Sequence, residues 1–484
     1  MADRLTPLDA TFLELEEADD SAHMHIGAIM VFDGEGRPAP TRQELCAHLD
    51  QRLVLLPRYS QRLSRPYTGG LRWPEWQDDP GFDLLAHVTR AALPSPGGHE
   101  ELADWASRFF SERLDRLRPL WEMVIIEGLQ DGRWALATKT HHCMVDGVGS
   151  VDVGTVLLDD EPRRGTRGVR RAVDGPAGPE RTTGISGSRI AQAWSGLLPV
   201  ESVAHAAQMG AHGMMHPREA LRGARAALEM IAREELVAAP RTSLNRPIGT
   251  HRRFDAVAIP LADLRAIRTG LGGTVNDAVL TIVAGAVREL LITRGELPPE
   301  GGLRAMVPMN VRAAGERLAL GNRISSLFID LPVSEPDPAR RHMETTARSH
   351  ALKADGAQAA GTSAVLDLAG LAPPALHSTI AQALYATRLF NLTITNVPGP
   401  QQTLYVLGAP LREVYPLVPL AAEHALGVAI FSYDGDAYFG VVADRDTVPD
   451  MQVVLDALTR EAGDLLEAAR SGHDHAAYIR ADAE

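Results

Sequence analysis

The feature that most constrains the fold of this chain is a β-hairpin pattern in its first third. Two runs rich in Trp, Val, Ile and Thr, residues 121–129 and 133–140, are separated by Asp131-Gly132. An Asp-Gly pair between such runs is a strong signal for a tight turn between antiparallel strands. The sequence therefore predicts a hairpin whose second strand leads into a histidine pair, and a loop at the end of a rigid strand is a common place for chemistry.

The loop after this strand reads His141-His142-Cys143-Met144-Val145-Asp146-Gly147. Adjacent residues of an extended chain point to opposite faces, so at most one of the two histidines faces a given cleft. A neutral imidazole is suited to accept a proton from an attacking hydroxyl. Asp146 could orient that imidazole or pair with an arginine, and Gly147 gives conformational freedom to the loop. A polar cluster, or a metal site shared with His23 and His25, is the alternative interpretation of the same residues.

Several segments together resemble one family. The His-His-x3-Asp-Gly run is similar to the signature of coenzyme A-dependent acyltransferases and of peptide synthetase condensation domains, whose fold resembles chloramphenicol acetyltransferase. Five further segments resemble the bacterial wax ester synthase/acyl-CoA:diacylglycerol acyltransferase family: Pro7-Leu8-Asp9, Pro119-Leu120-Trp121, Asn276-Asp277-Ala278-Val279-Leu280, Gly321-Asn322-Arg323-Ile324-Ser325 and Asn396-Val397-Pro398-Gly399-Pro400. Their order along the chain is more specific than any single segment.

The resemblance implies an α/β fold of two chloramphenicol acetyltransferase-like mixed-sheet domains with a tunnel at their interface. It implies an O-acyltransferase that moves a long-chain acyl group from acyl-CoA to diacylglycerol or to a long-chain alcohol. His142 is then the general base, and His141, Asp146 and Gly147 are supporting residues, with Asp146 in a structural, arginine-pairing role. Acyl-CoA is expected as a cosubstrate, with no bound cofactor and no metal.

A second candidate segment, Asn276-Asp277, opens a predicted helix. Thr274 is its expected N-cap, and an apolar stripe follows at positions 275, 279, 282, 283 and 287. Acidic charge in a first turn often serves only the helix dipole. The resemblance favours a second interpretation, in which Asn276 approaches the active site and donates a hydrogen bond to the substrate or the oxyanion, with Asp277 beside it.

Composition predicts three regions. Residues 159–188 are dense in Arg, Gly, Pro and Thr without apolar periodicity, which is typical of a linker. We therefore expect an N-terminal domain at 1–158 that carries the histidine motif, a linker and helical connector at 159–245, and a C-terminal domain at 246–484. Helices expected within 190–236 carry Leu, Met and Trp at helical spacing, and we favour packing on the body of the protein over contact with a membrane.

Charge and cysteine content narrow the partners and the compartment. The net charge of −14 argues against a nucleic-acid partner and against general electrostatic attraction to an anionic membrane. Two cysteines give no disulfide framework, the N-terminus lacks signal-peptide character, and no apolar run reaches the roughly 18–20 residues that cross a bilayer. The expected location is the cytosol, with any contact to the inner face of the membrane or to lipid droplets being peripheral. Cys143 is expected to be a packing residue rather than a nucleophile.

Three alternatives stay open at this point. A related acyltransferase of the same fold could use a polyketide-like or peptide-like hydroxyl as acceptor. A lipid-binding protein of the same fold would need no catalytic His142. A metal-dependent hydrolase would need a bound metal and would lose activity to chelators.

Overall fold

The computed structural model describes residues 5–64, 74–144, 157–162, 239–310, 324–354 and 389–481. The elements before residue 145 are α1 (Pro7–Ala18), β1 (His25–Phe32), α2 (Arg42–Leu53), β2 (Gln61–Leu63), β3 (Trp76–Asp78), α3 (Leu84–His87), β4 (Val88–Ala92), α4 (His99–Ser111), β5 (Trp121–Glu127) and β6 (Trp134–His141). Those after residue 239 are β7 (Arg252–Pro260), α10 (Leu261–Leu271), α11 (Val275–Thr293), β8 (Leu303–Asn310), β9 (Ile324–Leu331), α12 (Pro338–Ala354), β10 (Leu392–Pro398), β11 (Tyr405–Val406), β12 (Ala409–Leu417), β13 (Leu426–Tyr433), β14 (Asp436–Asp444) and α15 (Met451–Ala481).

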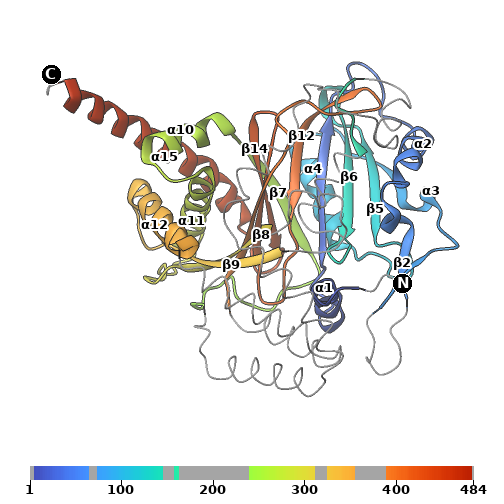
Figure 1. Ribbon diagram of the computed structural model, residues 1–484, viewed down its shortest axis with the longest axis horizontal. Coiled ribbons are helices and arrows are strands. Elements are labelled where there is room, and N and C mark those ends of the chain that lie inside the picture. Colours follow the sequence, from blue (N-terminus) through green and yellow to red (C-terminus); the bar gives the residue numbers. More distant parts are fainter. Residues whose placement is uncertain are drawn as a thin grey trace, which may run out of the picture.

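Two six-stranded sheets lie side by side (Figure 1). The first has the order β11-β12-β1-β6-β5-β4 and the second has the order β7-β14-β13-β10-β8-β9. Each sheet is mixed, because β4 runs parallel to β5, and β10 runs parallel to both β8 and β13, while the other pairs are antiparallel. The expected mixed-sheet α/β fold is thus confirmed.

The predicted hairpin is present and carries the histidine pair. Strands β5 and β6 pair antiparallel, with Trp121 opposite Thr140. Asp131 and Gly132 in the connection have φ of 60° and 69°. This left-handed backbone is the reason for the Asp-Gly sequence, since Gly and Asp tolerate positive φ better than most residues. The hairpin delivers His141 as the last residue of β6.

Strand β12 belongs to the first sheet although it comes late in the chain. It pairs antiparallel with β1, with Gly27 opposite Leu417. The sheet that carries the histidine pair is therefore built from both ends of the chain. The division at residues 158 and 246 stays a prediction about folding units, but the first sheet is not made by the N-terminal part alone.

Helix α4 lies against β7, the edge strand of the second sheet. It thereby joins the elements before residue 145 to the second sheet. The Ser107 hydroxyl oxygen accepts from the amide of Phe254 at 2.9 Å, and that of Ser111 accepts from the amide of Arg252 at 2.8 Å. An uncovered strand edge leaves backbone donors unpaired. The two serines satisfy two of these donors, so α4 fixes the edge of β7 beside the first sheet.

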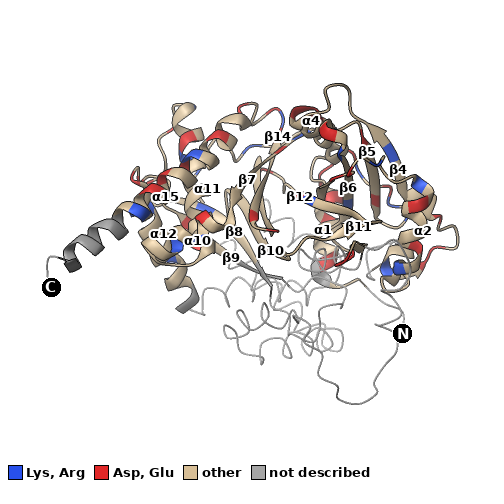
Figure 2. Cartoon of the chain, turned by 90° about the horizontal axis from the view of Figure 1, so that it is seen from above, with Lys and Arg blue, Asp and Glu red and all other residues tan. Residues whose placement is uncertain are grey.

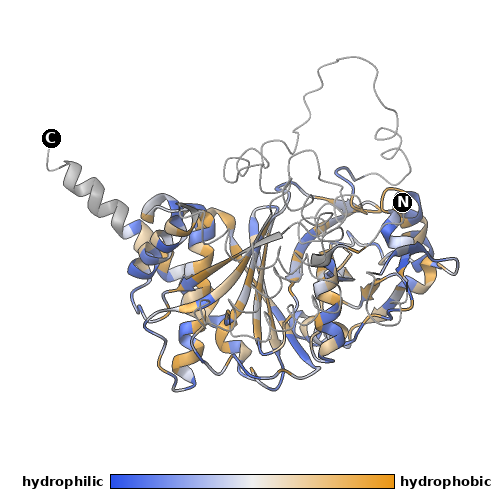
Figure 3. Cartoon of the chain, turned by 60° about the horizontal axis from the view of Figure 1, so that its bottom comes forward, coloured by the Kyte–Doolittle hydropathy of each residue, from blue (hydrophilic) through white to orange (hydrophobic). Residues whose placement is uncertain are grey.

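Helices α10, α11, α12 and α15 gather on the outer side of the second sheet (Figure 1). The predicted apolar stripe of α11 is confirmed as core at four positions, since Val279, Ile282, Val283 and Val287 are at most 1% exposed, while Val275 is partly buried. Charged residues lie mainly on the helices (Figure 2), and apolar residues concentrate on the central strands (Figure 3). In the part of the chain that the structure describes, no helix is long and apolar enough to span a membrane.

Candidate active site

The backbone at the end of β6 is held from both sides. His141 lies opposite His25 of β1. Its amide donates to the carbonyl of Leu120 at 2.9 Å, and the amide of His142 donates to the carbonyl of Met24 at 2.8 Å. Because neighbouring segments hold both amides, the two imidazoles leave the chain in fixed directions.

The two histidines have different environments. His141 is 0% exposed, whereas His142 is half-buried. The His142 ring stacks on Phe12 of α1, with the ring centroids 4.0 Å apart and the planes 16° from parallel. Stacking of this kind restricts the rotation of both rings. Helix α1 therefore sets the orientation of the half-buried imidazole.

His141, the fully buried histidine of the pair, is held through both of its ring nitrogens. Nδ1 of His141 accepts from the amide of Cys143 at 3.1 Å, so the proton sits on Nε2, which lies 3.0 Å from Oε2 of Glu16. The side chain of His141 is thus bonded to the backbone two residues further along the chain. The ring of His141 thus holds the turn in which His142 sits.

Glu16 is the centre of a buried polar network that the sequence did not reveal. It is 0% exposed, and besides His141 it accepts from the amide of Met24 at 3.2 Å and from Arg113 at 3.1 Å. Burial alone would raise the pKa of this carboxyl, but the hydrogen bonds from His141 and from the amide of Met24 hold it well below the usual range. The one available signal was the helical spacing of Glu16 from buried Leu13, which puts a carboxylate on an apolar face.

Asn276 and Asp277 have different roles at the start of α11. Asp277 is 2% exposed and forms a capping box with Thr274, accepting from its amide at 2.8 Å and from its hydroxyl at 2.7 Å. The Asn276 carbonyl oxygen accepts from the side-chain amide of Asn396 on β10 at 3.1 Å. Two segments 120 residues apart are thereby joined, and Asn276 keeps its own NH2 group as a donor.

Asp146 and Gly147 lie outside the described residues, as do the helices expected within 190–236 and the segment Gly321-Asn322-Arg323. Among the residues that the structure describes, His, Cys, Asp and Glu form no group of three or more that could hold a metal ion. His23 and His25 lie near His141 and Glu16, with the rings of His25 and His141 5.9 Å apart.

Cys143, which follows the two histidines, is buried in the hydrophobic core. It is 1% exposed, and burial raises the pKa of its thiol well above the usual value. Because the thiolate is the reactive form, we expect native protein to resist alkylation at Cys143. A Cys143→Ser variant should keep turnover within about threefold of wild type, since a buried thiol held in its protonated form is a poor nucleophile. Turnover assays and mass spectrometry after iodoacetamide treatment check this, and loss of turnover with normal folding would contradict it.

Comparison with known proteins shows the family of this chain. The profile of the wax ester synthase/diacylglycerol acyltransferase catalytic domain matches residues 5–279, and that of the WS/DGAT C-terminal domain matches residues 320–465. The chain belongs to the wax ester synthase/diacylglycerol acyltransferase family. Two proteins of Mycobacterium tuberculosis named as probable diacylglycerol O-acyltransferases are similar to this member. One is 34% identical over 458 residues, covering 92% of each chain, and the other is 32% identical over 470 residues, covering 96% of this chain and 99% of the relative.

Solved structures agree with this family member's fold. The wax ester synthase/diacylglycerol acyltransferase from Marinobacter aquaeolei VT8 matches with a TM-score of 0.69 and 29% identity, covering 96% of this chain and 99% of that one. The first condensation domain of the calcium-dependent antibiotic synthetase, at 14% identity and a TM-score of 0.58 over 97% of this chain and 96% of that one, shares the fold alone. The predicted family and the predicted enzyme class, an acyl-CoA-dependent O-acyltransferase, are confirmed.

Proposed function

We propose that this enzyme transfers a long-chain acyl group from acyl-CoA to diacylglycerol, to a long-chain alcohol or to both. The similarity to proteins named diacylglycerol O-acyltransferases supports diacylglycerol, and the similarity to a named wax ester synthase supports the alcohol. The observation that carries the proposal is the half-buried His142, held on a fixed turn and stacked on Phe12.

In the proposed reaction, His142 takes the proton of the acceptor hydroxyl as its oxygen attacks the thioester carbonyl. The tetrahedral intermediate collapses with cleavage of the C–S bond, and His142 returns the proton to the leaving CoA thiolate. The products are an ester and free CoA. A positioned base of this kind contributes about 10²–10⁴ in rate, and the remainder comes from orientation of the substrates and from stabilisation of the oxyanion.

His141 and Glu16 support this base without touching the substrate. Their contact at 3.0 Å and the hydrogen bond from Cys143 to His141 hold the turn in one conformation. Asp146 and Gly147 are proposed to complete the turn, with Asp146 paired to an arginine. We propose no bound cofactor and no metal, because general-base transfer between a hydroxyl and a thioester needs neither.

Asn276 is proposed to donate to the oxyanion or to the substrate, with Asn396 as a positioning residue. The bond from Asn396 fixes the Asn276 amide so that its NH2 group faces away from Asn396. Asp277 is proposed to act through the capping box, which sets the start of α11. Because the proposed acceptors are apolar, we propose peripheral contact of this enzyme with a membrane or a lipid droplet during substrate uptake.

The acceptor is tested by measuring CoA release from long-chain acyl-CoA with diacylglycerol, with a long-chain alcohol, or with neither. We expect release that depends on one or both acceptors and formation of the matching ester. Release without any acceptor reports hydrolysis and serves as the control. If neither acceptor stimulates release, transfer to a polyketide-like or peptide-like hydroxyl becomes the function to test, and binding of lipid without release would favour a non-catalytic role.

Substitution at Asn276 tests the part of the proposed site that lies at the start of α11. We expect Asn276→Ala to lower kcat by about 10²-fold, the usual effect of removing an oxyanion donor. Asn396→Leu should lower kcat by about tenfold, and the double variant should be no worse than Asn276→Ala alone, because Asn396 acts only through Asn276. Thr395→Val, at the neighbouring position on the other face of β10, is the control. Additive losses in the double variant would contradict the positioning role of Asn396.

A further inference from the structure

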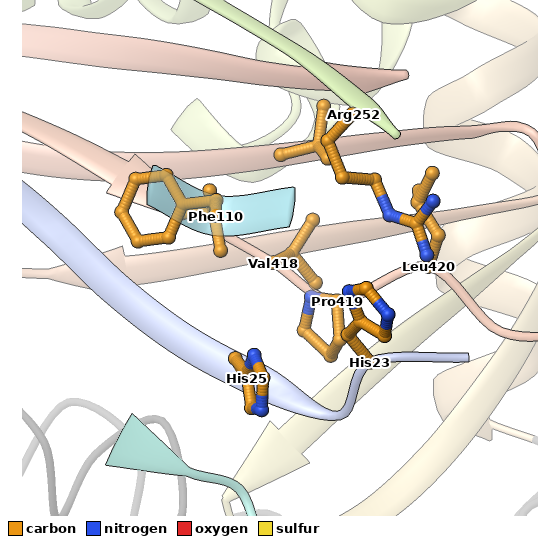
Figure 4. A pocket seen from close by; sticks show the side chains of 9 residues that line it. His23, His25, Phe110, Arg252, Val418, Pro419 and Leu420 are labelled. Carbon is orange, nitrogen blue, oxygen red and sulfur yellow. The ribbon is translucent and has the colours of Figure 1, made fainter. Parts of the chain in front are cut away.

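A small cavity lies between the two halves of the molecule, next to the site (Figure 4). His23 and His25 at the start of β1, Arg252 at the start of β7 and Phe110 of α4 line it, together with apolar side chains that include Val418 and Leu420. Its free volume of about 10 Å³ is at the lower limit of what one water molecule needs. Both histidines are buried, at 4% and 2% exposure.

The proton of His23 is on Nε2. This nitrogen lies 3.1 Å from the carbonyl oxygen of Asp20, which can only accept. Burial and the charge of Arg252 lower the pKa of His23 to about 4, so the ring is neutral at pH 7. Its Nδ1 is therefore a lone-pair acceptor, and it is buried without a partner among the described residues.

The proton of His25 is on the other nitrogen. Nε2 of His25 accepts from the amide of Leu114 at 3.5 Å. Burial lowers the pKa of this ring well below its usual value, so it too is neutral and its proton must sit on Nδ1. This Nδ1–H donor is likewise buried without a partner among the described residues. The two rings, with centroids 5.8 Å apart, thus line one cavity with one unmatched acceptor and one unmatched donor.

We infer that the cavity holds one water molecule, which accepts from Nδ1–H of His25 and donates to Nδ1 of His23. Water is the ligand that matches one donor and one acceptor in a space of this size. An anion would face the lone pair of His23, and a metal ion would face the proton of His25. Neither of these ligands fits both nitrogens, whereas a bridging water satisfies both buried groups.

The water has a consequence for the proposed acyl transfer, on which this step rests. Nε2 of His25 lies only 3.8 Å from Oε2 of Glu16, the oxygen that accepts from His141. In its other tautomer, His25 would present a proton to Glu16 and compete with His141 for that oxygen. By accepting from Nδ1–H, the water acts together with the Leu114 amide, which donates to Nε2, to favour the tautomer that leaves Glu16 to His141. His23 and His25 are therefore positioning residues for the turn that carries His142.

Arg252, which lines the cavity, also connects the segment before β1 to the second sheet. Arg252 donates to the carbonyl of Ser21, just before His23, and to the carbonyl of Gly249 at 2.7 Å. It also lies 3.9 Å from Asp444 at the end of β14. Arg252 thus has hydrogen-bond and ion-pair partners of its own, and the groups that the water satisfies are the two imidazoles.

Two measurements test the inference on the full-length enzyme. A crystal structure at a resolution that shows ordered waters should place one water within hydrogen-bond distance of both Nδ1 atoms. ¹⁵N NMR of histidine-labelled protein should show the Nδ1–H tautomer for His25 and the Nε2–H tautomer for His23, with signals assigned by single substitutions. A dry cavity, or the Nε2–H tautomer at His25, would overturn the inference whether or not acyl transfer is observed.

Two variants test the positioning role. His23→Leu removes the acceptor, and we expect it to shift His25 toward the Nε2–H tautomer and to lower kcat about fivefold, the effect of one hydrogen bond. His23→Asn keeps an acceptor near the position of Nδ1 and should restore both the tautomer and most of kcat. If His23→Leu changes the tautomer of His25 but not kcat in an active enzyme, the water stands and its positioning role fails. An inactive wild type with the expected tautomers would instead count against the proposed function.

Discussion

Replacing His142 with alanine should lower acceptor-dependent CoA release by about 10²-fold or more while leaving the fold intact. The half-buried imidazole is the proposed base, whereas the neighbouring His141 is fully buried. The fall should appear in kcat, because His142 acts on the proton that moves in the transition state rather than on substrate binding alone. Steady-state assays with saturating acyl-CoA and a series of acceptor concentrations separate kcat from KM.

The control for this experiment is Cys143→Ser, the adjacent change within the same turn. A second control is circular dichroism of His142→Ala, since His142 is half-buried and its loss leaves the core packing in place.

Phe12→Leu should give an intermediate loss of kcat, because the base is kept but its stacking partner is removed. Release that is unchanged in His142→Ala would remove general-base catalysis by this residue from the proposed mechanism.

Replacing Glu16 with leucine should give the largest loss of stability among the site variants. The change leaves the buried His141, the partly exposed Arg113 and the amide of Met24 without the carboxylate that all three contact. Leaving a buried polar group without its partner typically costs about 1–3 kcal/mol in the free energy of unfolding. Urea denaturation followed by tryptophan fluorescence measures this cost, since Trp121 and Trp134 are buried in the first sheet, which also contains His141.

The neighbouring Glu17 supplies the matched control. Its side chain is 51% exposed and pairs with Arg116 at 2.8 Å, so Glu17→Ala should cost no more than about 1 kcal/mol. Wild-type stability in Glu16→Leu would contradict the view that this network holds the turn.

Acidity should weaken the Glu16 network in wild type. The folded state holds the pKa of Glu16 well below its ordinary value of 4.5, so this carboxylate stabilises the fold above about pH 4.5. Its contribution is lost progressively as pH falls from there toward the folded pKa, because protonation then becomes more favourable in the unfolded chain. Wild type should therefore lose more stability than Glu16→Leu over this acid range. Parallel pH series of the two proteins check the difference.

The local parts of the site could be predicted from the sequence. Asp131-Gly132 predicted the hairpin, and Thr274 predicted the start of α11, because each pattern acts on backbone a few residues away. The order of family-like segments predicted the family and the enzyme class. Such signals do not depend on how distant segments meet.

The contacts that organise the site could not be predicted in this way. Glu16 and His141 are 125 residues apart, and Asn276 and Asn396 are 120 apart. A periodic pattern reports which face of an element is buried but not which distant side chain will lie against that face. The same limit applies to Phe12, whose stacking on His142 depends on the placement of all of α1.

The position of β12 in the first sheet governs the order in which this enzyme can fold during synthesis. When β1, β5 and β6 have left the ribosome, the strand that covers the free edge of β1 has yet to be translated, because it spans Ala409–Leu417. Until then the nascent sheet presents an unpaired edge to other chains. The turn at His141 therefore becomes part of a complete sheet only late in translation, and fragments that end before residue 417 should be prone to aggregation rather than independently active.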